Sequence, residues 1–465
     1  FTKLIMIEIL ISVTFLIIAG YLIAKNYDAK IVLFLSGLAL LYATVIIGKP
    51  IFQEGSTGSV WLDPFKMATN VFTMQMGIVG LTIMVLFGFA NYMNHIGAND
   101  AMVHTLSKPI KKIKSVYILV PIVFLLGNAL QMVLPSAAGL AILLMATLYP
   151  ALRTAGMSPL TAGAVIATTA TITPTPLGSD NVVVAQRLGI TSLEYVMEFH
   201  AKVSIPALIA MAIAHLLWQR YMDKRQGTVH VPFEVPHSKD EKNAPLPPSW
   251  YSIFPIMPII LLLIFNLGFI DTKTQKSTIN IGLVEITLIS IIIPMFVELI
   301  RKGDIKQSIK DFNLFFEGMG QGFYQVVSLI IAAGLFVEGL KSIGVIGLLT
   351  NSLNDVQGAG SILMLFFSGM AALIGFISGS GIAVFHSFIK IIPEITEQMG
   401  VNTVLVALPM QLTANLIRSV SPVAAVIIVV ASTLKVSPIE IVKRTSIPVF
   451  TGIFVCLILS YYYFG

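Results

Sequence analysis

An all-α membrane protein built from two inverted repeats is the fold that this sequence predicts, and three observations predict it. First, 56% of the 465 residues are hydrophobic and only 11% are charged, whereas about a quarter of the residues of a soluble protein are charged. Second, apolar runs of about 20 residues, the length that crosses a bilayer, recur along the chain. Third, these runs follow the same order in both halves. We expect about ten transmembrane helices and two re-entrant helical hairpins.

Eight uninterrupted apolar runs are predicted to cross the membrane as single helices. They are 4–24, 31–48, 73–95, 200–219, 251–270, 278–300, 322–340 and 446–464. The first run is longer than the apolar core of a signal peptide and lacks a clear cleavage site, so we interpret it as a retained span. The lipid bilayer is therefore an expected partner. The net charge of +6 is small for this length and does not indicate a nucleic-acid partner.

Four further apolar stretches are interrupted. Residues 115–152 and 361–394 each contain a turn of small residues and are predicted to form helical hairpins. Residues 158–190 and 402–434 each contain a polar break with proline, which cannot continue a helix, and are predicted to form broken helices.

The shared order of span, hairpin, broken helix and closing span predicts an internal duplication. Residues 1–222 would form the first repeat, 223–249 a cytoplasmic linker, and 250–465 the second repeat. Gly156 and Gly400, which each follow a hairpin, are one of the local matches. If the Lys- and Arg-rich loops all lie in the cytoplasm, each repeat crosses the membrane five times, and the two repeats insert upside down relative to each other.

The interruptions are where we expect the chemistry. Non-helical backbone at membrane depth is tolerated only where protein or water satisfies its polar groups, so four breaks predict one shared polar site near the middle of the membrane. Free N–H groups and the positive dipole at helix ends suit an anion such as a carboxylate. The alternative is that the prolines and glycines only kink helices and the hydroxyls only cap them. The candidate substrate-binding residues at the tips and breaks are Ser136, Ala137, Gly139, Thr175, Gly178, Ser179, Asp180, Asn181, Ser378, Gly379, Ser380, Gly381, Asn415, Arg418, Ser419 and Ser421.

Ionisable residues stand out because charges are costly in a membrane and mark function there. Arg418 is expected to hold a substrate carboxylate in a bidentate pair, with pairing to a buried acid or to carbonyl groups as the alternative. Asp180 is open to three interpretations: that buried acid, a helix cap, or a site for a proton or a sodium ion. His386 and Lys390 are expected to face water, and Glu338 is a weaker candidate for proton coupling.

Motifs along nearly the whole chain resemble those of the anaerobic C4-dicarboxylate carrier family (Dcu type C). They include Gly88-Phe89-Ala90, His95 to Asp100, Ser136 to Leu140, Gly178-Ser179-Asp180, Ser378-Gly379-Ser380-Gly381, and Arg418 with Ser421-Pro422. The resemblance implies uptake, efflux or exchange of fumarate, succinate or malate across a bacterial inner membrane, without a cofactor. It also implies a homodimer and an elevator mechanism, in which a hairpin-bearing domain slides against a scaffold. The coupling ion, proton or sodium, stays open.

One departure from the family lies at the expected site. After Gly381 the chain reads Ile382-Ala383-Val384-Phe385-His386, where the family more often has a small polar residue and a tyrosine. A carrier of the same fold for another small organic anion or an amino acid is therefore the alternative. A membrane enzyme is disfavoured because the chain has no His-Glu-x-x-His motif, and its only cysteine, Cys456, has no histidine nearby in the sequence. A channel is disfavoured because discontinuous helices in inverted repeats are typical of alternating access.

Overall fold

The computed structural model describes residues 2–25, 27–108, 113, 115–134, 136–227, 247–267, 279, 281–344 and 358–465. Every regular element within these residues is a helix, and no strand occurs among them. Seven of the described helices are long and apolar enough to cross a membrane. The all-α membrane fold is thus confirmed, while the count of ten crossings and the inverted repeat stay predictions.

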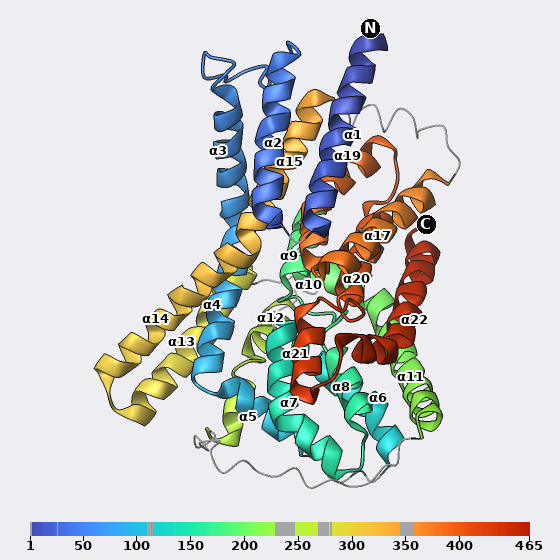
Figure 1. Cartoon of the computed structure of the whole chain (residues 1–465). Helices are drawn as coiled ribbons and strands as arrows, with labels where there is room; N and C mark the ends of the chain where they lie inside the picture. Colours follow the sequence, from blue (N-terminus) through green and yellow to red (C-terminus); the bar gives the residue numbers. More distant parts are fainter. Residues whose placement is uncertain are drawn as a thin grey trace.

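The first half of the chain begins with α1 and α2, and α2 starts where Asp28 accepts a hydrogen bond from the Lys30 amide at 2.9 Å. Two π-helical turns, Met76–Gly80 and Val196–His200, join α3 to α4 and α10 to α11, and the first of them is kinked at Gly77. The helices are α1 (Thr2–Ala24), α2 (Ala29–Ile46), α3 (Asp63–Gln75), α4 (Leu81–His95), α5 (Ala98–Ser107), α6 (Val116–Gln131), α7 (Ala137–Thr154), α8 (Pro159–Ala167), α9 (Ser179–Arg187), α10 (Ser192–Tyr195) and α11 (Ala201–Arg225) (Figure 1).

The second half begins with a 3-10 turn at Ser249–Ile253, and a π-helical turn at Phe323–Val327 joins α14 to α15. Gly303 and Gly344 end α13 and α15 in the left-handed conformation (φ 65° and 103°), the usual helix stop. The helices are α12 (Met257–Leu267), α13 (Leu283–Lys302), α14 (Ile305–Gly322), α15 (Ser328–Ile343), α17 (Ala359–Ser378), α18 (Gly381–Phe388), α19 (Ile391–Gln398), α20 (Thr403–Ile417), α21 (Ala425–Leu434) and α22 (Pro438–Phe464).

Helix ends fall inside the four stretches whose apolar pattern is interrupted. The gaps between helices lie at 132–136, 168–178, 379–380 and 418–424. The last arm of the segment 361–394 is itself divided, because a turn at 389–390 separates α18 from α19.

Two predicted spans proved to be parts of longer helices. The helices that contain the spans predicted at 73–95 and 322–340 extend further, because the chain is helical over 63–95 and 305–343 apart from the π-helical turns. The added helices α3 and α14 carry charged and amide side chains such as Lys310, which lower the hydropathy without preventing a helix. Hydropathy therefore detects only the apolar half of each long helix.

The helices pack into two groups. The first, the crossed group, comprises α2, α3, α4, α13, α14 and α15, in which α14 packs along α4 and α15 packs along α2. Glycines permit this close approach: a Cβ at Gly318 would lie 2.7 Å from the Phe87 carbonyl oxygen, and one at Gly339 would lie 2.7 Å from Leu40 Cβ. Small residues at helix crossings are the usual device for tight packing in membranes.

The second, the broken group, comprises α6 to α9, α11, α17, α18 and α20 to α22. Within it α11 packs along α22, α17 along α20, and α7 against α21. The crossed group runs down the left side of Figure 1, from α2, α3 and α15 at the top to α4, α13 and α14 at the lower left, and most of the broken group lies to its right. The two groups meet mainly where α15 contacts α18 and where α4 contacts α9.

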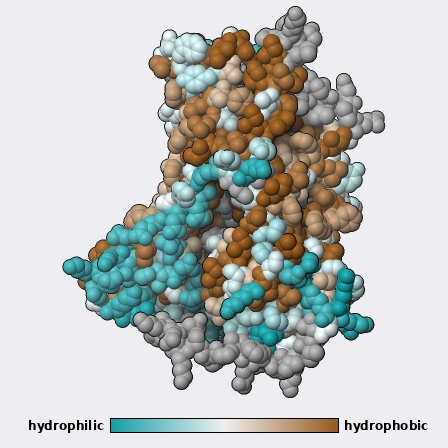
Figure 2. Space-filling view, viewed as in Figure 1, coloured by the Kyte–Doolittle hydropathy of each residue, from teal (hydrophilic) through white to brown (hydrophobic). Residues whose placement is uncertain are grey.

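The surface agrees with a membrane location. Figure 2 shows apolar residues over much of the upper part of this face, and hydrophilic residues gathered at the lower left, where α14 projects. Most of the predicted linker 223–249 lies outside the described residues.

Candidate functional site

A cavity lined by both apolar and polar side chains lies at the boundary between the two groups. One wall is α4 of the crossed group, and the broken group supplies the rest through the end of α6, the break between α8 and α9, the start of α18 and the end of α20. The lining residues are Leu86, Phe89, Ala90, Gln131, Met132, Val133, Thr171, Thr173, Thr175, Leu177, Gly178, Ser179, Asp180, Ile382, Asn415 and Arg418. Six of the residues predicted from the sequence are therefore brought together: Thr175, Gly178, Ser179, Asp180, Asn415 and Arg418.

Asp180 is held by neutral donors. It lies in the first turn of α9, where the helix dipole favours a carboxylate, but it forms no cap, because Gly178 is the N-cap residue and makes no side-chain hydrogen bond. Asp180 Oδ2 accepts hydrogen bonds from Gln411 Nε2 at 2.9 Å and from Asn415 Nδ2 at 2.6 Å. Two amides from α20 thus fix the carboxylate at the cavity wall.

Asn181 connects this carboxylate to a buried amide network. Its Oδ1 accepts from Gln411 Nε2 at 2.6 Å, and its Nδ2 donates to the Thr175 carbonyl oxygen at 2.7 Å. The Tyr195 hydroxyl donates to Gln411 Oε1 at 2.7 Å. Every polar atom of the Gln411 side chain is therefore engaged, which orients its Nε2 towards Asp180.

Arg418 is a buried cation in the cavity wall without an acidic partner. It is the C-cap residue of α20 and is 8% exposed. Its Nη2 donates to the Ala170 carbonyl oxygen at 2.5 Å, and its Nε is buried and has no hydrogen-bond partner. Among the described residues no acid lies within the 4.0 Å of an ion pair, so Asp180 is not its salt-bridge partner. Asp180 and Arg418 attract each other electrostatically without a direct contact.

Hydroxyls tie the two breaks to each other and to their hairpins. Ser419 Oγ donates to the Ala167 carbonyl oxygen at 3.0 Å, which satisfies the end of α8. Thr175 Oγ1 donates to the Met132 carbonyl oxygen at 2.9 Å. Ser421 Oγ donates to the carbonyl oxygen of Phe376 at 2.6 Å. These bonds satisfy non-helical backbone inside the protein, as an unwound segment at membrane depth requires.

The site residues predicted at the two hairpin tips do not line the cavity. Ser136 is exposed and caps α7, its Oγ accepting from the Gly139 amide at 3.1 Å. Ser380 is also exposed and makes no side-chain cap bond. Capping thus accounts for Ser136, and the remaining tip residues outside the lining are Ala137, Gly139, Ser378, Gly379 and Gly381.

Glycine at the second tip has a packing role. A Cβ on Gly381 would lie 1.7 Å from the Ala414 carbonyl oxygen, so no other residue fits there without displacing α20. Gly379 adopts φ 72°, and a Cβ on it would lie 2.9 Å from the backbone of Ala424. The second tip is therefore wedged against the break between α20 and α21, which positions the neighbouring Ile382 at the cavity.

Sequence reasoning missed several residues of this region. Phe89 and Ile382 line the cavity, and the buried His200 and His386 lie within electrostatic range of Asp180. Both ring nitrogens of His386 are buried without a partner. Phe89 lies in one of the family motifs and the stretch 382–386 departs from the family, but neither observation indicates that Phe89 and Ile382 line a cavity. No local pattern indicates that Tyr195 reaches Gln411.

The expectation that His386 and Lys390 face water is wrong for this conformation. His386 is 1% exposed and Lys390 is 6% exposed, because α18 packs against both α15 and α20. In the described part of the chain no group of three or more His, Cys, Asp or Glu side chains is arranged to hold a metal ion.

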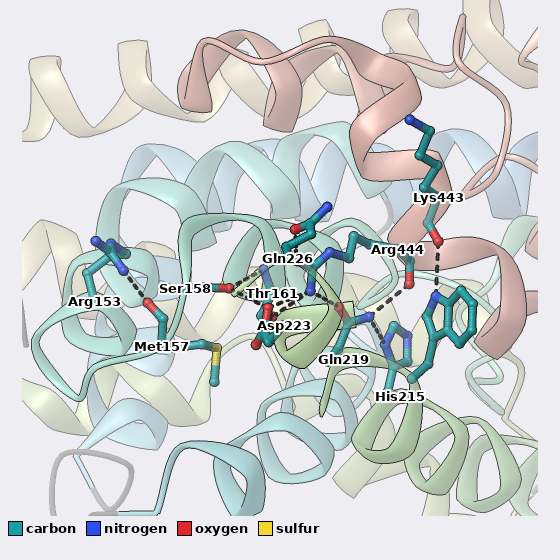
Figure 3. A network of polar contacts seen from close by, with 11 residues as sticks. Arg153, Met157, Ser158, Thr161, His215, Gln219, Asp223, Gln226, Lys443 and Arg444 are labelled. Atoms are coloured by element: carbon teal, nitrogen blue, oxygen red, sulfur yellow. Dashed lines mark hydrogen bonds and ion pairs between the residues drawn. The ribbon is translucent and has the colours of Figure 1, made fainter. Parts of the chain in front are cut away.

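A second buried polar cluster lies in the same group of helices. Arg444 of α22 forms an ion pair with Asp223 of α11 at 2.6 Å, and both side chains are 1% exposed. Asp223 also accepts from the hydroxyls of Ser158 (3.1 Å) and Thr161 (2.9 Å), and Gln226 accepts from Arg444 Nη2 at 2.5 Å. Figure 3 shows these side chains converging from α8, α11 and α22.

The chain is similar to known proteins over nearly its whole length. A family model described as C4-dicarboxylate anaerobic carrier matches residues 7–463. The "Probable anaerobic C4-dicarboxylate transporter DcuC" of Vibrio cholerae is 37% identical over 458 residues, which is 97% of this chain and 97% of that protein. The "Anaerobic C4-dicarboxylate transporter DcuC" of Escherichia coli K12 is 35% identical over 454 residues, covering 97% of this chain and 96% of the relative.

One solved structure resembles the fold. It is that of Neisseria gonorrhoeae MtrF, described as illuminating "a Class of Antimetabolite Efflux Pumps", and it matches with a TM-score of 0.58 over 94% of this chain and 96% of that chain. The two sequences are 15% identical, so the match shows a shared fold and nothing about the substrate.

Proposed function

The chain belongs to the C4-dicarboxylate anaerobic carrier family, and from that premise we propose that it moves fumarate, succinate or malate across the membrane through the cavity at Asp180 and Arg418. Membership makes it a multi-pass transporter of the bacterial inner membrane and not an enzyme. The observation that carries the proposal is the buried guanidinium of Arg418, which lines the cavity with no acid beside it in the described part of the chain.

Arg418 is the proposed carboxylate contact. A guanidinium offers five N–H donors in a planar fork that matches a carboxylate. In Arg418 the Nη2 group donates to a carbonyl oxygen, while Nε has no partner within the described residues. Ser179 and Asn415 line the same cavity and supply neutral donors. In this proposal one substrate carboxylate binds Arg418 and the other binds hydroxyl and amide groups of the breaks.

Asp180 is the proposed site of the coupling ion. An uncompensated carboxylate in an anion-binding cavity repels the substrate, so a cation must offset its charge when the substrate binds. Asp180 accepts two neutral hydrogen bonds, from Gln411 and Asn415, and has no ion pair within the described residues. A proton or a sodium ion would supply the missing charge.

We further propose alternating access in which the broken group slides as an elevator against the crossed group, within a homodimer of inverted repeats. The cavity has one wall on α4 and the rest on the broken group, so relative movement of the two groups would carry the bound substrate with Arg418 and Asp180. The equal order of helix pair, broken helix and closing helix in the two halves supports the duplication. Uptake, efflux and exchange all follow from one such cycle.

Counterflow in proteoliposomes tests the assignment. Vesicles preloaded with succinate should accelerate the entry of labelled succinate through the wild-type chain, and Arg418→Ala should abolish that acceleration while the protein stays folded. Arg225→Ala is the matched control, because Arg225 lies in the exposed last turn of α11. Wild-type counterflow in Arg418→Ala would show that the guanidinium does not bind the substrate.

A small amino acid is the second candidate, and Asp180 is the observation that favours it. A carboxylate facing Arg418 across one cavity would suit a substrate with an ammonium and a carboxylate group. Competition by unlabelled compounds separates the two: succinate and fumarate should block labelled succinate entry under the first proposal, and aspartate should block it more strongly under the second.

A further inference from the structure

Two cations, the buried Lys390 and the half-buried Arg187, cross the boundary between the two helix groups at one place. Lys390, which follows α18, donates from Nζ to Glu338 Oε1 at 2.8 Å and to the Gly334 carbonyl oxygen at 3.3 Å. Arg187, the last residue of α9, donates from Nη2 to Gln75 Oε1 at 3.1 Å. Both cations belong to the broken group and the acceptors belong to the crossed group. We call the side chains of Arg187, Lys390, Gln75 and Glu338 the latch.

The two contacts of the latch are neighbours in space. A Cβ on Gly334 of α15 would lie 3.5 Å from Gln75 Nε2 and 3.6 Å from Lys390 Nζ, and 2.9 Å from Val71 Cγ1 of α3. Both cations also interact electrostatically with Glu338. The absence of a side chain at Gly334 therefore allows α9 and the end of α18 to pack closely against α3 and α15 at the same point.

The latch lies at the far ends of the two helices whose near ends form the cavity. α9 runs from Asp180 at the cavity to Arg187, and α18 leads from Ile382 at the cavity to Lys390. At 1.5 Å per residue each cation is roughly 10 Å from the cavity. Glu338 precedes the end of α15 at Ile343, whose carbonyl oxygen accepts from Lys49 of loop 47–62 at 2.9 Å. The latch thus lies between the cavity and the side of the molecule that carries this loop.

We propose that the latch is the gate that closes the cavity towards the side of loop 47–62. This rests on the proposed transport function, since a carrier must close one route to its site while the other is open. α9 and α18 cannot move away from α3 and α15 without separating Lys390 from Glu338 and Arg187 from Gln75.

The pairing of the latch suits a contact that opens and closes. The Lys390–Glu338 pair is mostly buried, with side chains 7% and 17% exposed, so separating the two charges requires that water enters between them. Gln75 Nε2 and Arg187 Nε are buried without partners among the described residues, so the closed contact is not fully satisfied. A second ion pair beside the latch joins Lys341 of α15 to Glu394 of α19 at 3.4 Å; its side chains are 55% and 24% exposed, so solvent screens it more than the Lys390–Glu338 pair.

Thiol labelling tests the gate without any substrate. Leu177→Cys places a thiol in the cavity wall, and the native chain is the blank because Cys456 is fully buried. An impermeant thiol reagent is added on one side of reconstituted vesicles at a time, with Glu54→Cys in loop 47–62 as the marker of that side. Glu338→Gln should raise the labelling rate of Leu177→Cys from that side by about tenfold, the factor that ~1.4 kcal/mol in the open–closed equilibrium produces.

Glu440→Gln is the matched control, because it removes the same charge from an exposed ion pair within α22, with Lys443. It should leave the labelling rate within about twofold, as expected for an exposed pair. An unchanged rate in Glu338→Gln, an equal increase in Glu440→Gln, or an increase only from the opposite side would each overturn the proposal. Labelling needs no dicarboxylate, so the two proposals can fail separately. A chain that shows this labelling pattern but does not transport succinate would refute the proposed function and support the gate.

A cross-link gives a second test if Glu338→Gln does not fold. Lys341→Cys with Glu394→Cys places two thiols on α15 and α19 beside the latch, where the native side-chain ends are 3.4 Å apart. A bifunctional methanethiosulfonate, which spans the space left by the two shorter side chains, should stop succinate exchange, and reduction should restore it. The control is the same reagent on Glu440→Cys with Lys443→Cys, an exposed pair within α22 whose bridging should leave exchange unchanged. Exchange that continues at the same rate in the cross-linked Lys341→Cys, Glu394→Cys chain would overturn the gate.

Discussion

The two buried polar clusters of the broken group are paired in opposite ways. In one cluster the charge of Asp223 is matched by the charge of Arg444 at 2.6 Å and by the hydroxyls of Ser158 and Thr161. In the cavity Asp180 and Arg418 have opposite charges and lie near each other, yet the described residues give them only neutral partners. The same group of helices therefore contains one pair of charges in direct contact, which we call the closed pair, and one pair without direct contact, which we call the open site.

This difference separates structure from function. Charges that neutralise each other hold α8, α11 and α22 in place, and they offer little binding energy to a ligand. Charges that contact only amides and carbonyl groups are not neutralised by each other, so each can still attract a ligand of opposite charge. A preorganised site binds an ion or a carboxylate in this way. Burial alone, which both clusters share, does not identify the site.

The largest expected effect comes from breaking the closed pair. Arg444→Ala leaves Asp223 buried without its counter-charge, and removing one partner of a buried pair costs about 3–5 kcal/mol. The thermal unfolding midpoint in detergent should fall sharply. Lys443→Ala, at the neighbouring exposed position, should change stability by no more than about 0.5 kcal/mol. Equal midpoints for the two variants would show that the closed pair does not hold the fold.

The same chemical change can be made in both clusters. Asp223→Asn should cost about 3–5 kcal/mol, because it leaves Arg444 buried without its counter-charge. Asp180→Asn should cost less than about 1 kcal/mol, because Gln411 and Asn415 are neutral donors, while concentrative uptake of succinate should be lost. Unfolding and uptake are measured on the same preparations. The comparison breaks if Asp180→Asn is the more destabilising variant.

A smaller change should disturb the open site without unfolding the chain. A Cβ on Gly178 would lie 2.9 Å from Asp180 Oδ1 and 3.1 Å from Asn181 Nδ2. Gly178→Ala should push these groups aside and weaken succinate binding about tenfold, which corresponds to ~1.4 kcal/mol. Gly320→Ala is the control, since no atom lies within 4 Å of a Cβ there. Calorimetric titration of both variants checks the difference, and equal affinities would contradict it.

The smallest effect concerns a carboxylate outside the spans. The Thr57 amide donates to Asp63 Oδ1 at 2.8 Å, and this bond, more than the hydroxyls of Thr57 and Ser56, keeps the pKa of Asp63 below its ordinary value of 3.8. A lowered pKa means that the stabilisation is complete above the ordinary value and is lost as the pH falls through the lower one. The protection factor of the Thr57 amide, its exchange rate relative to an unstructured amide at the same pH, should therefore fall only in acid below that value, and Asp63→Asn should remove this pH dependence. A protection factor that falls near neutral pH would contradict this.

The sequence predicts the interruptions of the fold better than its long helices. Prolines and glycines mark the gaps at 168–178 and 418–424, because these residues act on the local backbone. The first half of the helix 305–343 escapes prediction because Lys310 and its neighbours make it polar. Such residues signal water in a hydropathy average, even where the helix continues.

The site was predictable where local chemistry suffices and not where tertiary packing decides. Arg418 and Asp180 are detectable because a charge inside an apolar stretch is rare. The serines of the hairpin tips look equally suitable in the sequence, but Ser136 and Ser380 are exposed away from the cavity. Tyr195 reaches Gln411 across 216 positions of the chain, and no local pattern contains that information.

The helix over 305–343 also has a consequence for the surrounding lipid. Its 39 residues amount to about 58 Å at 1.5 Å per residue, well beyond the ~30 Å hydrocarbon core and the ~45 Å of a whole bilayer. It must lie strongly tilted or project from the membrane, and hydrophobic mismatch then acts directly on the bend between α14 and α15. We expect turnover in vesicles to vary with acyl-chain length, so that the thickness of the host membrane becomes one of the conditions that set the rate of this carrier.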